Sequence, residues 1–179
     1  MGDQLSAQDW VNQGLKVLAK SGFTALKAEP LAKAMGVSRG SFYWHFADIS
    51  AFHVEILKAW REIAAEQIIA GVEASAADEN PLGVLLRRVF GERLAIENAV
   101  RIWASVDPTV RAAVQAIDRR RLSYIEGLMT KSGLSADTAR ARAQILYWAF
   151  LGFAQSDRPL PKAQQAAMLD EMLRIADAR

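Results

Sequence analysis

Residues 31–46 read LAKAMGVSRGSFYWHF. Two short helices that cross at a steep angle need a small residue at the crossing and a residue that tolerates a left-handed backbone in the turn. Ala32 and Gly36 have these properties, and Phe42 supplies the apolar side chain by which the second helix reaches the core. The spacing predicts a helix-turn-helix, a unit with which many proteins enter the major groove of DNA. The alternative is a purely structural helical hairpin.

The second helix of this unit is expected to have one apolar side. Phe42 and Phe46 lie four residues apart, so they share a face of the helix. The other faces carry residue types that bind DNA: arginine donates to a guanine edge, serine bonds a base or a phosphate, and tyrosine and histidine donate to phosphate oxygens. These residues are Arg39, Ser41, Tyr43, Trp44 and His45.

The rest of the chain is divided by helix-start signals. Ser6 followed by Asp9 forms a variant of the capping box. Asn80-Pro81 and Asp107-Pro108 each read as an N-cap and the first helical residue. Hairpin turns and sustained alternation of apolar and polar residues are missing, so strands are not expected. The sequence predicts an all-α fold, with further helix starts at Asp48 and Ser135.

The composition excludes several classes of protein. The chain has 179 residues, 51% hydrophobic and 23% charged, which suits one ordinary domain or two small ones and excludes a disordered chain. There is no cysteine, so disulfides, thiolate ligands and a cysteine nucleophile are excluded. The two histidines, His45 and His53, leave little for a metal site, and we expect neither a metal nor another cofactor.

Location and activity are predicted from missing signals. No apolar run approaches the ~18 residues of a membrane span, and residues 1–10 lack a secretion signal, so we expect a cytoplasmic protein with no membrane partner. An enzyme is not expected, because no nucleophile elbow, phosphate-binding loop, metal-ligand spacing or poised pair of carboxylates is present. Most of the excess of lysine and arginine over aspartate and glutamate lies in residues 80–179, not around the predicted helix-turn-helix.

Residues 22–52, GFTALKAEPLAKAMGVSRGSFYWHFADISAF, resemble the N-terminal domain of the tetracycline repressor (TetR) family of bacterial transcriptional regulators. The resemblance extends over about residues 6–57. Residues 102–127 look like one of the family's C-terminal domain types, and the remainder is similar only in length and in being all-helical. The matching positions are Ala25-Leu26, Leu31-Ala32, Gly36-Val37-Ser38, Tyr43-Trp44-His45-Phe46 and Asp48.

The resemblance implies a homodimer that binds a palindromic DNA operator, represses transcription and is released by a small-molecule effector. It implies a three-helix DNA-binding domain over residues 1–47 and a helical ligand-binding and dimerisation domain over residues 48–179. Carried over by position, the DNA-binding residues divide by role. Arg39, Gly40 and Ser41 face base edges, Tyr43 and His45 hold phosphates, Trp44 packs against the DNA backbone or a thymine methyl, and Ser38 caps the helix and touches a phosphate.

Two positions depart from the family's pattern. Ile49 stands where the family often has a lysine that grips a phosphate, and Glu29 stands where arginine is frequent. Losing one cation and reversing another weakens phosphate binding and its salt dependence, and Lys27 compensates in part. An alternative is therefore a small-molecule-binding helical protein with weakened DNA affinity.

The C-terminal part supplies further candidates. Aromatic residues with polar tips and a cation within an apolar block are expected to line the effector pocket, although each also suits the core. These are Arg101, Trp103, Tyr124 and Tyr147. The last two helices are candidate dimer surface, with covering of the subunit's own core as the alternative. Their candidate residues are Ile145, Trp148, Leu151, Gly152, Met168 and Met172.

Overall fold

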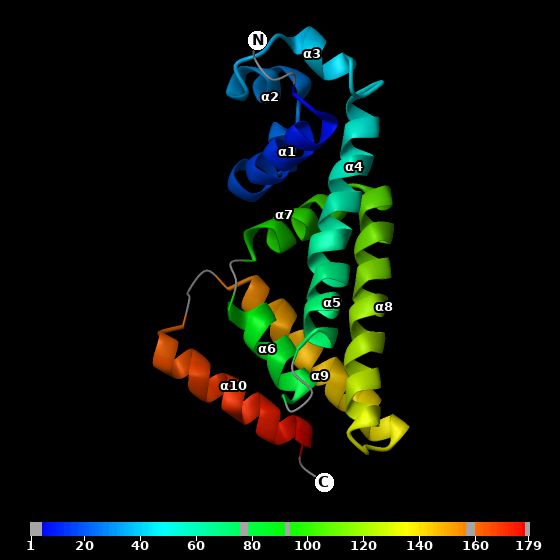
Figure 1. The fold of residues 1–179 in the computed structure, drawn as a ribbon, viewed down its shortest axis with the longest axis vertical. Coiled ribbons are helices and arrows are strands. Elements are labelled where there is room, and N and C mark those ends of the chain that lie inside the picture. The colour runs from blue at the N-terminus through cyan, green and yellow to red at the C-terminus, as the bar shows by residue number, and fades with distance from the viewer. Residues whose placement is uncertain (1–4, 76–78, 92–93, 157–159, 178–179) are drawn as a thin grey trace. The chain divides into compact units, whose positions relative to one another are not determined.

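The computed structural model describes residues 5–75, 79–91, 94–156 and 160–177, and Figure 1 shows its helices. These residues form helices and no strand, which confirms the all-α fold class. In chain order the elements are α1 (Ala7–Ser21), the 3-10 turn η1 (Phe23–Ala25), α2 (Ala28–Ala34), α3 (Arg39–Tyr43), α4 (Ile49–Arg61), the π-helical turn η2 (Glu62–Glu66), α5 (Gln67–Glu73), α6 (Pro81–Gly91), α7 (Ala95–Ala104), α8 (Pro108–Lys131), α9 (Ala136–Ala154) and α10 (Lys162–Asp177).

Side chains cap the helices at the predicted starts. Ser6 and Asp9 form a complete capping box at α1. The carboxylate of Asp48 accepts the backbone N–H of Ala51 at 2.7 Å, at the start of α4. Asn80 and Asp107 accept backbone N–H groups at the starts of α6 and α8, and Ser135 does so at α9. Each cap satisfies a donor that the helix itself leaves unpaired.

Met1–Ala64 and Ala95–Gln115 form one compact unit. Its centre is a cluster of rings contributed by α1, α3, the α3–α4 turn and α4. The ring of Phe42 lies 5.3 Å from Trp10, 5.1 Å from Phe46 and 5.3 Å from Phe52, measured between centroids. Such contacts fix the orientation of the short helix α3, which is too short to be stable alone.

The close approach of α1 to α4 in this unit depends on a glycine. A Cβ atom added to Gly14 would lie 2.5 Å from Cδ1 of Ile56 and 2.6 Å from Cζ of Phe52. These distances are shorter than van der Waals contact, so a larger residue there would push α4 away from α1.

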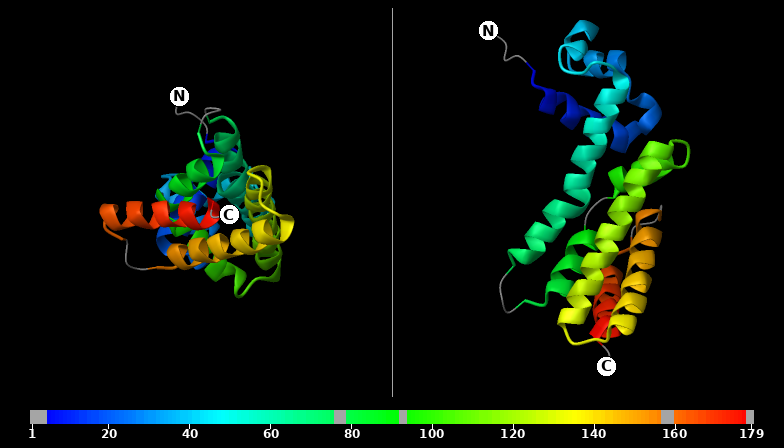
Figure 2. Two further views of the ribbon diagram at one scale, coloured as in Figure 1. Left: turned by 90° about the horizontal axis from the view of Figure 1, so that it is seen from below. Right: turned by 90° about the vertical axis from the view of Figure 1, so that its right-hand side faces the viewer.

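Ala65–Leu94 and Ala116–Arg179 form the second compact unit. Its helices α6, α9 and α10 lie side by side (Figures 1 and 2). Arg142 of α9 donates to the carbonyl of Ala176 at 2.9 Å, and Gln165 donates to the carbonyl of Phe90, so both ends of α10 are tied down. The core of the unit consists of Val72, Leu82, Leu85, Leu86, Phe90, Ile125, Met129, Ala139, Ala143, Leu146, Tyr147, Phe150 and Ala176.

The two compact units do not coincide with the division between residues 1–47 and 48–179, because α4 and α7 pack with the N-terminal helices. That division concerns function and stays a prediction. No helix in the described ranges is long and apolar enough to cross a membrane. Residues 1–4, which belong to the stretch inspected for a secretion signal, lie outside the described residues.

Candidate nucleic-acid interface and ligand site

The turn between α2 and α3 has the geometry that the sequence predicts. Gly36 has φ of 70°, a left-handed backbone that glycine adopts without strain. The backbone N–H of Val37 donates to the carbonyl of Ala32 at 3.0 Å, which closes the turn. Phe42 is completely buried. With that side of α3 held in the core, its opposite side is left for a partner.

The predicted DNA-binding residues gather on the solvent side of α3. Ser38, Arg39 and Gly40 are exposed, and Ser41 and His45 are half-buried. Tyr43 is 45% exposed and Trp44 is 85% exposed. The indole ring of Trp44 is therefore accessible to a partner.

Arg39 and Tyr43 contact each other across one turn of α3. The guanidinium Nη2 donates to the phenol oxygen at 3.1 Å, and Cζ of Arg39 lies 5.5 Å from the centre of the tyrosine ring. The hydrogen bond to Tyr43 raises the pKa of Arg39, and the negative charge of Glu29 adds a smaller contribution. The arginine is therefore a permanent cation held beside an aromatic ring.

A surface groove of about 630 Å³ runs between α2, α3 and the start of α4. Its cations are Lys27, Lys33 and Arg39, and Glu29 is the acidic residue on its wall. These three cations can pair with the phosphates of a nucleic-acid backbone. The remaining lining residues are Ala28, Pro30, Tyr43 and Ile49.

The capping role expected for Ser38 is wrong. Ser38 occupies the N-cap position of α3 with an extended backbone, but its side chain accepts no cap hydrogen bond. The first turn of α3 is closed instead by the backbone, through the N–H of Ser41 and the carbonyl of Ser38 at 3.0 Å. The serine hydroxyl is thus not used by the helix. Lys27 occupies the N-cap position of α2 and likewise makes no side-chain cap.

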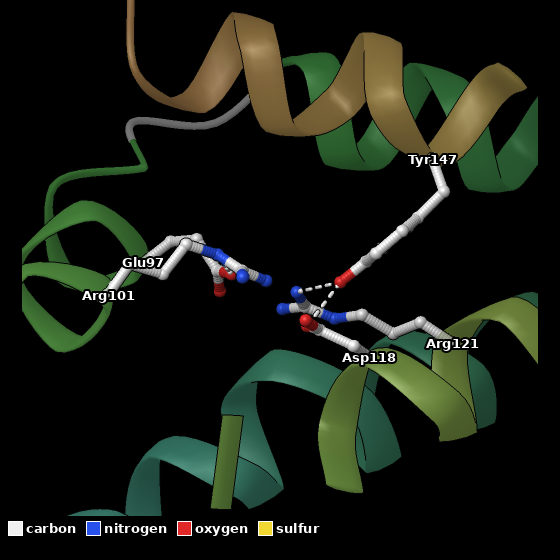
Figure 3. A network of polar contacts seen from close by, with 5 residues as sticks. All are labelled: Glu97, Arg101, Asp118, Arg121 and Tyr147. Carbon is white, nitrogen blue, oxygen red and sulfur yellow. Dashed lines mark hydrogen bonds and ion pairs between the residues drawn. The ribbon is translucent and has the colours of Figure 1, made fainter. Parts of the chain in front are cut away.

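Arg101 and Trp103, two of the predicted ligand residues, lie on α7 in the first unit. Arg101 Nε donates to Glu97 Oε1 at 2.8 Å, and Glu97 is only 4% exposed (Figure 3). The ring of Trp103 is buried and stacks on Phe23, with centroids 6.0 Å apart. It also meets His53 edge-on at 4.9 Å. These contacts connect α7 to η1 and α4, which gives Trp103 the core role that the sequence left open beside the ligand role.

Tyr147, a third predicted ligand residue, belongs to the second unit. It is 3% exposed, and its hydroxyl donates to Asp118 Oδ1 at 2.6 Å while accepting from Arg121 Nη1 at 3.5 Å (Figure 3). Burial raises the pKa of Tyr147 to about 12; Arg121 opposes this rise, and the hydrogen bond to Asp118 adds to it. The Arg121 guanidinium lies 5.1 Å from the centre of the Phe150 ring.

Tyr124, the fourth, also lies in the second unit and packs against its core. Its hydroxyl is buried and has no hydrogen-bond partner within the described ranges. Burial raises its pKa, with a further contribution from the charge of Glu73. A buried hydroxyl without a partner costs about 1–3 kcal/mol, which a polar atom of a ligand would recover.

The predicted dimer residues divide into two groups. On α9, Ile145 is 52% exposed, Trp148 is 64% exposed and Gly152 is exposed. Leu151 of α9, together with Met168 and Met172 of α10, is partly buried against the unit's own core. The exposed group therefore forms an uncovered apolar surface, whereas the second group already has a role within the subunit.

The helix-turn-helix decides the family. Residues 11–55, which contain α2, α3 and the turn between them, match the family model for "Bacterial regulatory proteins, tetR family". Residues 11–55 of this chain are thus a tetR-family segment. The match and the all-α fold together support a DNA-binding regulator for this chain. No curated protein sequence matches it significantly.

Solved structures share the tetR-family fold over nearly the whole chain. A protein from Saccharomonospora viridis, described as a transcriptional regulator in complex with choline, is 15% identical with a TM-score of 0.74, covering 94% of this chain and 95% of its own. A tetR-family regulator from Rhodococcus sp. is 15% identical with a TM-score of 0.72, covering 96% and 99%. The multidrug binding protein EbrR, complexed with malachite green, is 18% identical with a TM-score of 0.65, covering 94% and 96%.

Sequence reasoning missed Lys33 among the candidate DNA contacts around this helix-turn-helix. Lys33 follows Glu29 by four residues on α2, so the two share a face, and both line the groove. That spacing was available as a signal. Asp118 and Arg121 were missed as partners of Tyr147, because they lie 29 and 26 residues away in the sequence and no local pattern connects them.

Proposed function

We propose that this protein binds a palindromic operator as a homodimer, represses transcription, and is released by a small-molecule effector. One observation carries the proposal: α3 is anchored by the buried Phe42 and turns Arg39, Tyr43 and Trp44 outward beside a groove that contains Lys27. A rigid helix with outward-facing donors and a flanking cationic groove can read base edges and hold phosphates at once.

The residue roles follow from this arrangement. Arg39 and Ser41 contact base edges, while Ser38 and His45 bond phosphates and Trp44 packs on the sugar-phosphate backbone. Gly40 allows close approach, since a Cβ there would meet only the Ser38 hydroxyl, at 3.6 Å. Lys27 and Lys33 add phosphate contacts from α2. In this proposal residues 1–47 bind DNA and residues 48–179 bind the effector and dimerise.

Selection of genomic DNA fragments by the purified protein, followed by sequencing, tests the operator. We expect enrichment of a palindrome whose half-sites are spaced for a dimer with two reading helices. The measurement requires near-physiological salt, because phosphate contacts alone give binding without preference at low salt. A folded, dimeric protein that enriches no sequence would contradict the proposal.

The exposed face of α9 is the proposed dimer surface. Ile145, Trp148 and Gly152 follow each other at helical spacing. In a two-fold symmetric dimer the same three residues of both subunits would be buried in the interface. Gly152 has open space around its Cβ direction, so it can admit a partner helix closely.

Replacing Trp148 with glutamate should break the dimer. A large ring at the centre of such an interface contributes about 2 kcal/mol or more, so we expect the dimer dissociation constant to rise at least about 30-fold. Sedimentation equilibrium measures it. Trp44→Glu, which places the same charge at the more exposed tryptophan that caps the C-terminus of α3, should leave the dimer unchanged. A Trp148→Glu protein that stays dimeric would locate the interface elsewhere.

The effector proposed for this chain is an amphipathic molecule with an aromatic or alkyl body. Tyr147 and Tyr124 offer polar tips within the apolar second unit, and the Tyr124 hydroxyl is ready for a partner. Arg101 and Trp103, on α7 in the first unit, stay separate candidates for an effector contact. The similar structures that hold choline and malachite green make cationic compounds the first probes. Release of the selected DNA fragment by either compound supports this chemistry, and failure of both argues against a cationic effector.

The second candidate function is that of a small-molecule-binding protein with weakened DNA affinity. Two residues of the groove support this candidate. Ile49 and Glu29 line the groove in place of cations. Replacing Ile49 with lysine should raise DNA affinity about 3–10-fold and steepen the salt dependence by about one released ion. Fluorescence anisotropy at several salt concentrations measures both. If only the Ile49→Lys protein enriches an operator, the second candidate holds; if wild type does so unaided, the first holds.

A further inference from the structure

Arg39 and Tyr43 are the first and last residues of α3. Residues four apart on a helix are neighbours on its surface. Their side chains make two contacts at once, the 3.1 Å hydrogen bond from the guanidinium to the phenol oxygen and the approach of Cζ to within 5.5 Å of the ring centre. The pair thus behaves as one unit rather than as two separate side chains.

Tyr43 is held in place from beneath. Its ring meets the ring of Phe42 edge-on, with centroids 5.3 Å apart and planes at 83°. Phe42 is fully buried among Trp10, Phe46 and Phe52. A chain of contacts therefore runs from the rigid core through Tyr43 to the Arg39 guanidinium.

This arrangement matters because an exposed arginine normally samples many rotamers. Fixing a long side chain on binding costs conformational entropy, which lowers the affinity. Arginine reads guanine with two parallel N–H bonds, which requires the plane of the guanidinium to be set correctly. A hydrogen bond to one nitrogen and a ring beneath the guanidinium set that plane in advance, and other N–H groups are left for the base.

The groove also helps to hold the Arg39 guanidinium in place, through an electrostatic attraction. Glu29 lines the same groove as Arg39 and Tyr43, and its negative charge acts attractively on the Arg39 cation. The hydrogen bond to Tyr43 and the attraction to Glu29 therefore both oppose movement of the Arg39 guanidinium toward DNA phosphates.

We propose that Tyr43 is a positioning residue for Arg39 and thereby determines base preference, rather than serving as a phosphate contact. The inference rests on the proposed operator binding. It reverses the expectation from position alone, under which the Tyr43 hydroxyl holds a phosphate and loss of that hydroxyl weakens binding to every sequence equally.

The test compares wild type with Arg39→Ala, Tyr43→Phe and the double variant on the selected operator and on its single-base substitutions. The base position read by Arg39 is the one at which Arg39→Ala loses preference. At this position we expect Tyr43→Phe to reduce discrimination about 3–10-fold, the size of one lost hydrogen bond. Preference at other positions should stay within about twofold, as should affinity for unrelated DNA.

The double variant separates positioning from independent contact. If Tyr43 acts through Arg39, Tyr43→Phe changes nothing further in the Arg39→Ala background. Arg39→Lys is the matched control for charge, because it keeps the cation but lacks the planar fork. It should retain affinity for unrelated DNA, lose the base preference and be insensitive to Tyr43→Phe.

Tyr43→Phe keeps the ring and its contact with Phe42, and matched thermal unfolding midpoints verify the fold. Tyr43→Phe could instead weaken binding to all sequences equally, or weaken binding by the same factor in the Arg39→Ala background. Either result would overturn the positioning role and indicate that the Tyr43 hydroxyl contacts a phosphate. Unchanged binding to every sequence would overturn it as well. A wild type that enriches no sequence defeats the proposed function and this inference together, whereas an enriched palindrome with an unaffected Tyr43→Phe defeats this inference alone.

Discussion

Replacing Phe42 with alanine should lower the free energy of unfolding of the first unit by about 3–5 kcal/mol, the usual cost of truncating a buried phenylalanine. Phe42 is completely buried, and its ring contacts Trp10, Phe46 and Phe52. The substitution removes the shared partner of these rings and leaves a cavity where α3 is anchored. Urea denaturation followed by tryptophan fluorescence measures the loss.

Trp44→Ala is the matched control, because it truncates an aromatic residue on the same helix end that is 85% exposed. It should change stability by no more than about 0.5 kcal/mol. Both variants should weaken operator binding, Phe42→Ala through loss of α3 and Trp44→Ala through loss of a DNA contact. A Phe42→Ala protein as stable as the control would mean that the ring cluster does not anchor the reading helix.

Alkaline pH should destabilise the second unit through Tyr147. Burial raises the pKa of this phenol from 10.0 to about 12 in the folded chain. Below pH 10 the phenol is neutral in both states and its contribution to stability is complete. As the pH rises from about 10 to about 12, the unfolded chain ionises first, so about 2–3 kcal/mol of stability is lost.

The measurement is the free energy of unfolding at several pH values between 9 and about 12, for wild type and for Tyr147→Phe. All other groups of the chain are the same in both proteins, so the difference between the two slopes isolates Tyr147. We expect the wild type to lose stability more steeply. Parallel curves would show that the phenol is not shielded by burial, and a steeper loss in Tyr147→Phe would reverse the sign of the argument.

Much of the local structure follows from the sequence because its causes are local. A capping side chain acts on backbone groups two or three residues away, so Ser6, Asp48 and Asn80 mark helix starts that the structure confirms. The helix-turn-helix is predictable for the same reason, since Gly36 and Phe42 act within one turn and one short helix. The separation of the buried Phe42 from the exposed Arg39 is a consequence of helical periodicity.

Contacts between distant segments could not be read in this way. Trp103 looked like a pocket residue, yet it stacks on Phe23, 80 positions earlier in the chain. No sequence pattern near Tyr147 indicated its hydrogen bond with Asp118. An apolar helical face indicates that a residue is buried, but it does not indicate which residue packs against it. Many apolar partners are compatible with the same sequence pattern.

The sequence by itself determined that this protein is helical, where most of its helices begin, and that it carries a tetR-family helix-turn-helix with a polar reading face. Tertiary structure alone decided which rings anchor that helix, that Ser38 leaves its cap to the backbone, and that Lys33 joins Lys27 and Arg39 in one groove. The physical reason is the distance along the chain over which each kind of interaction acts. Hydrogen bonds within a turn are fixed by neighbouring residues, whereas packing is chosen by the chain as a whole, from competing contacts of similar energy.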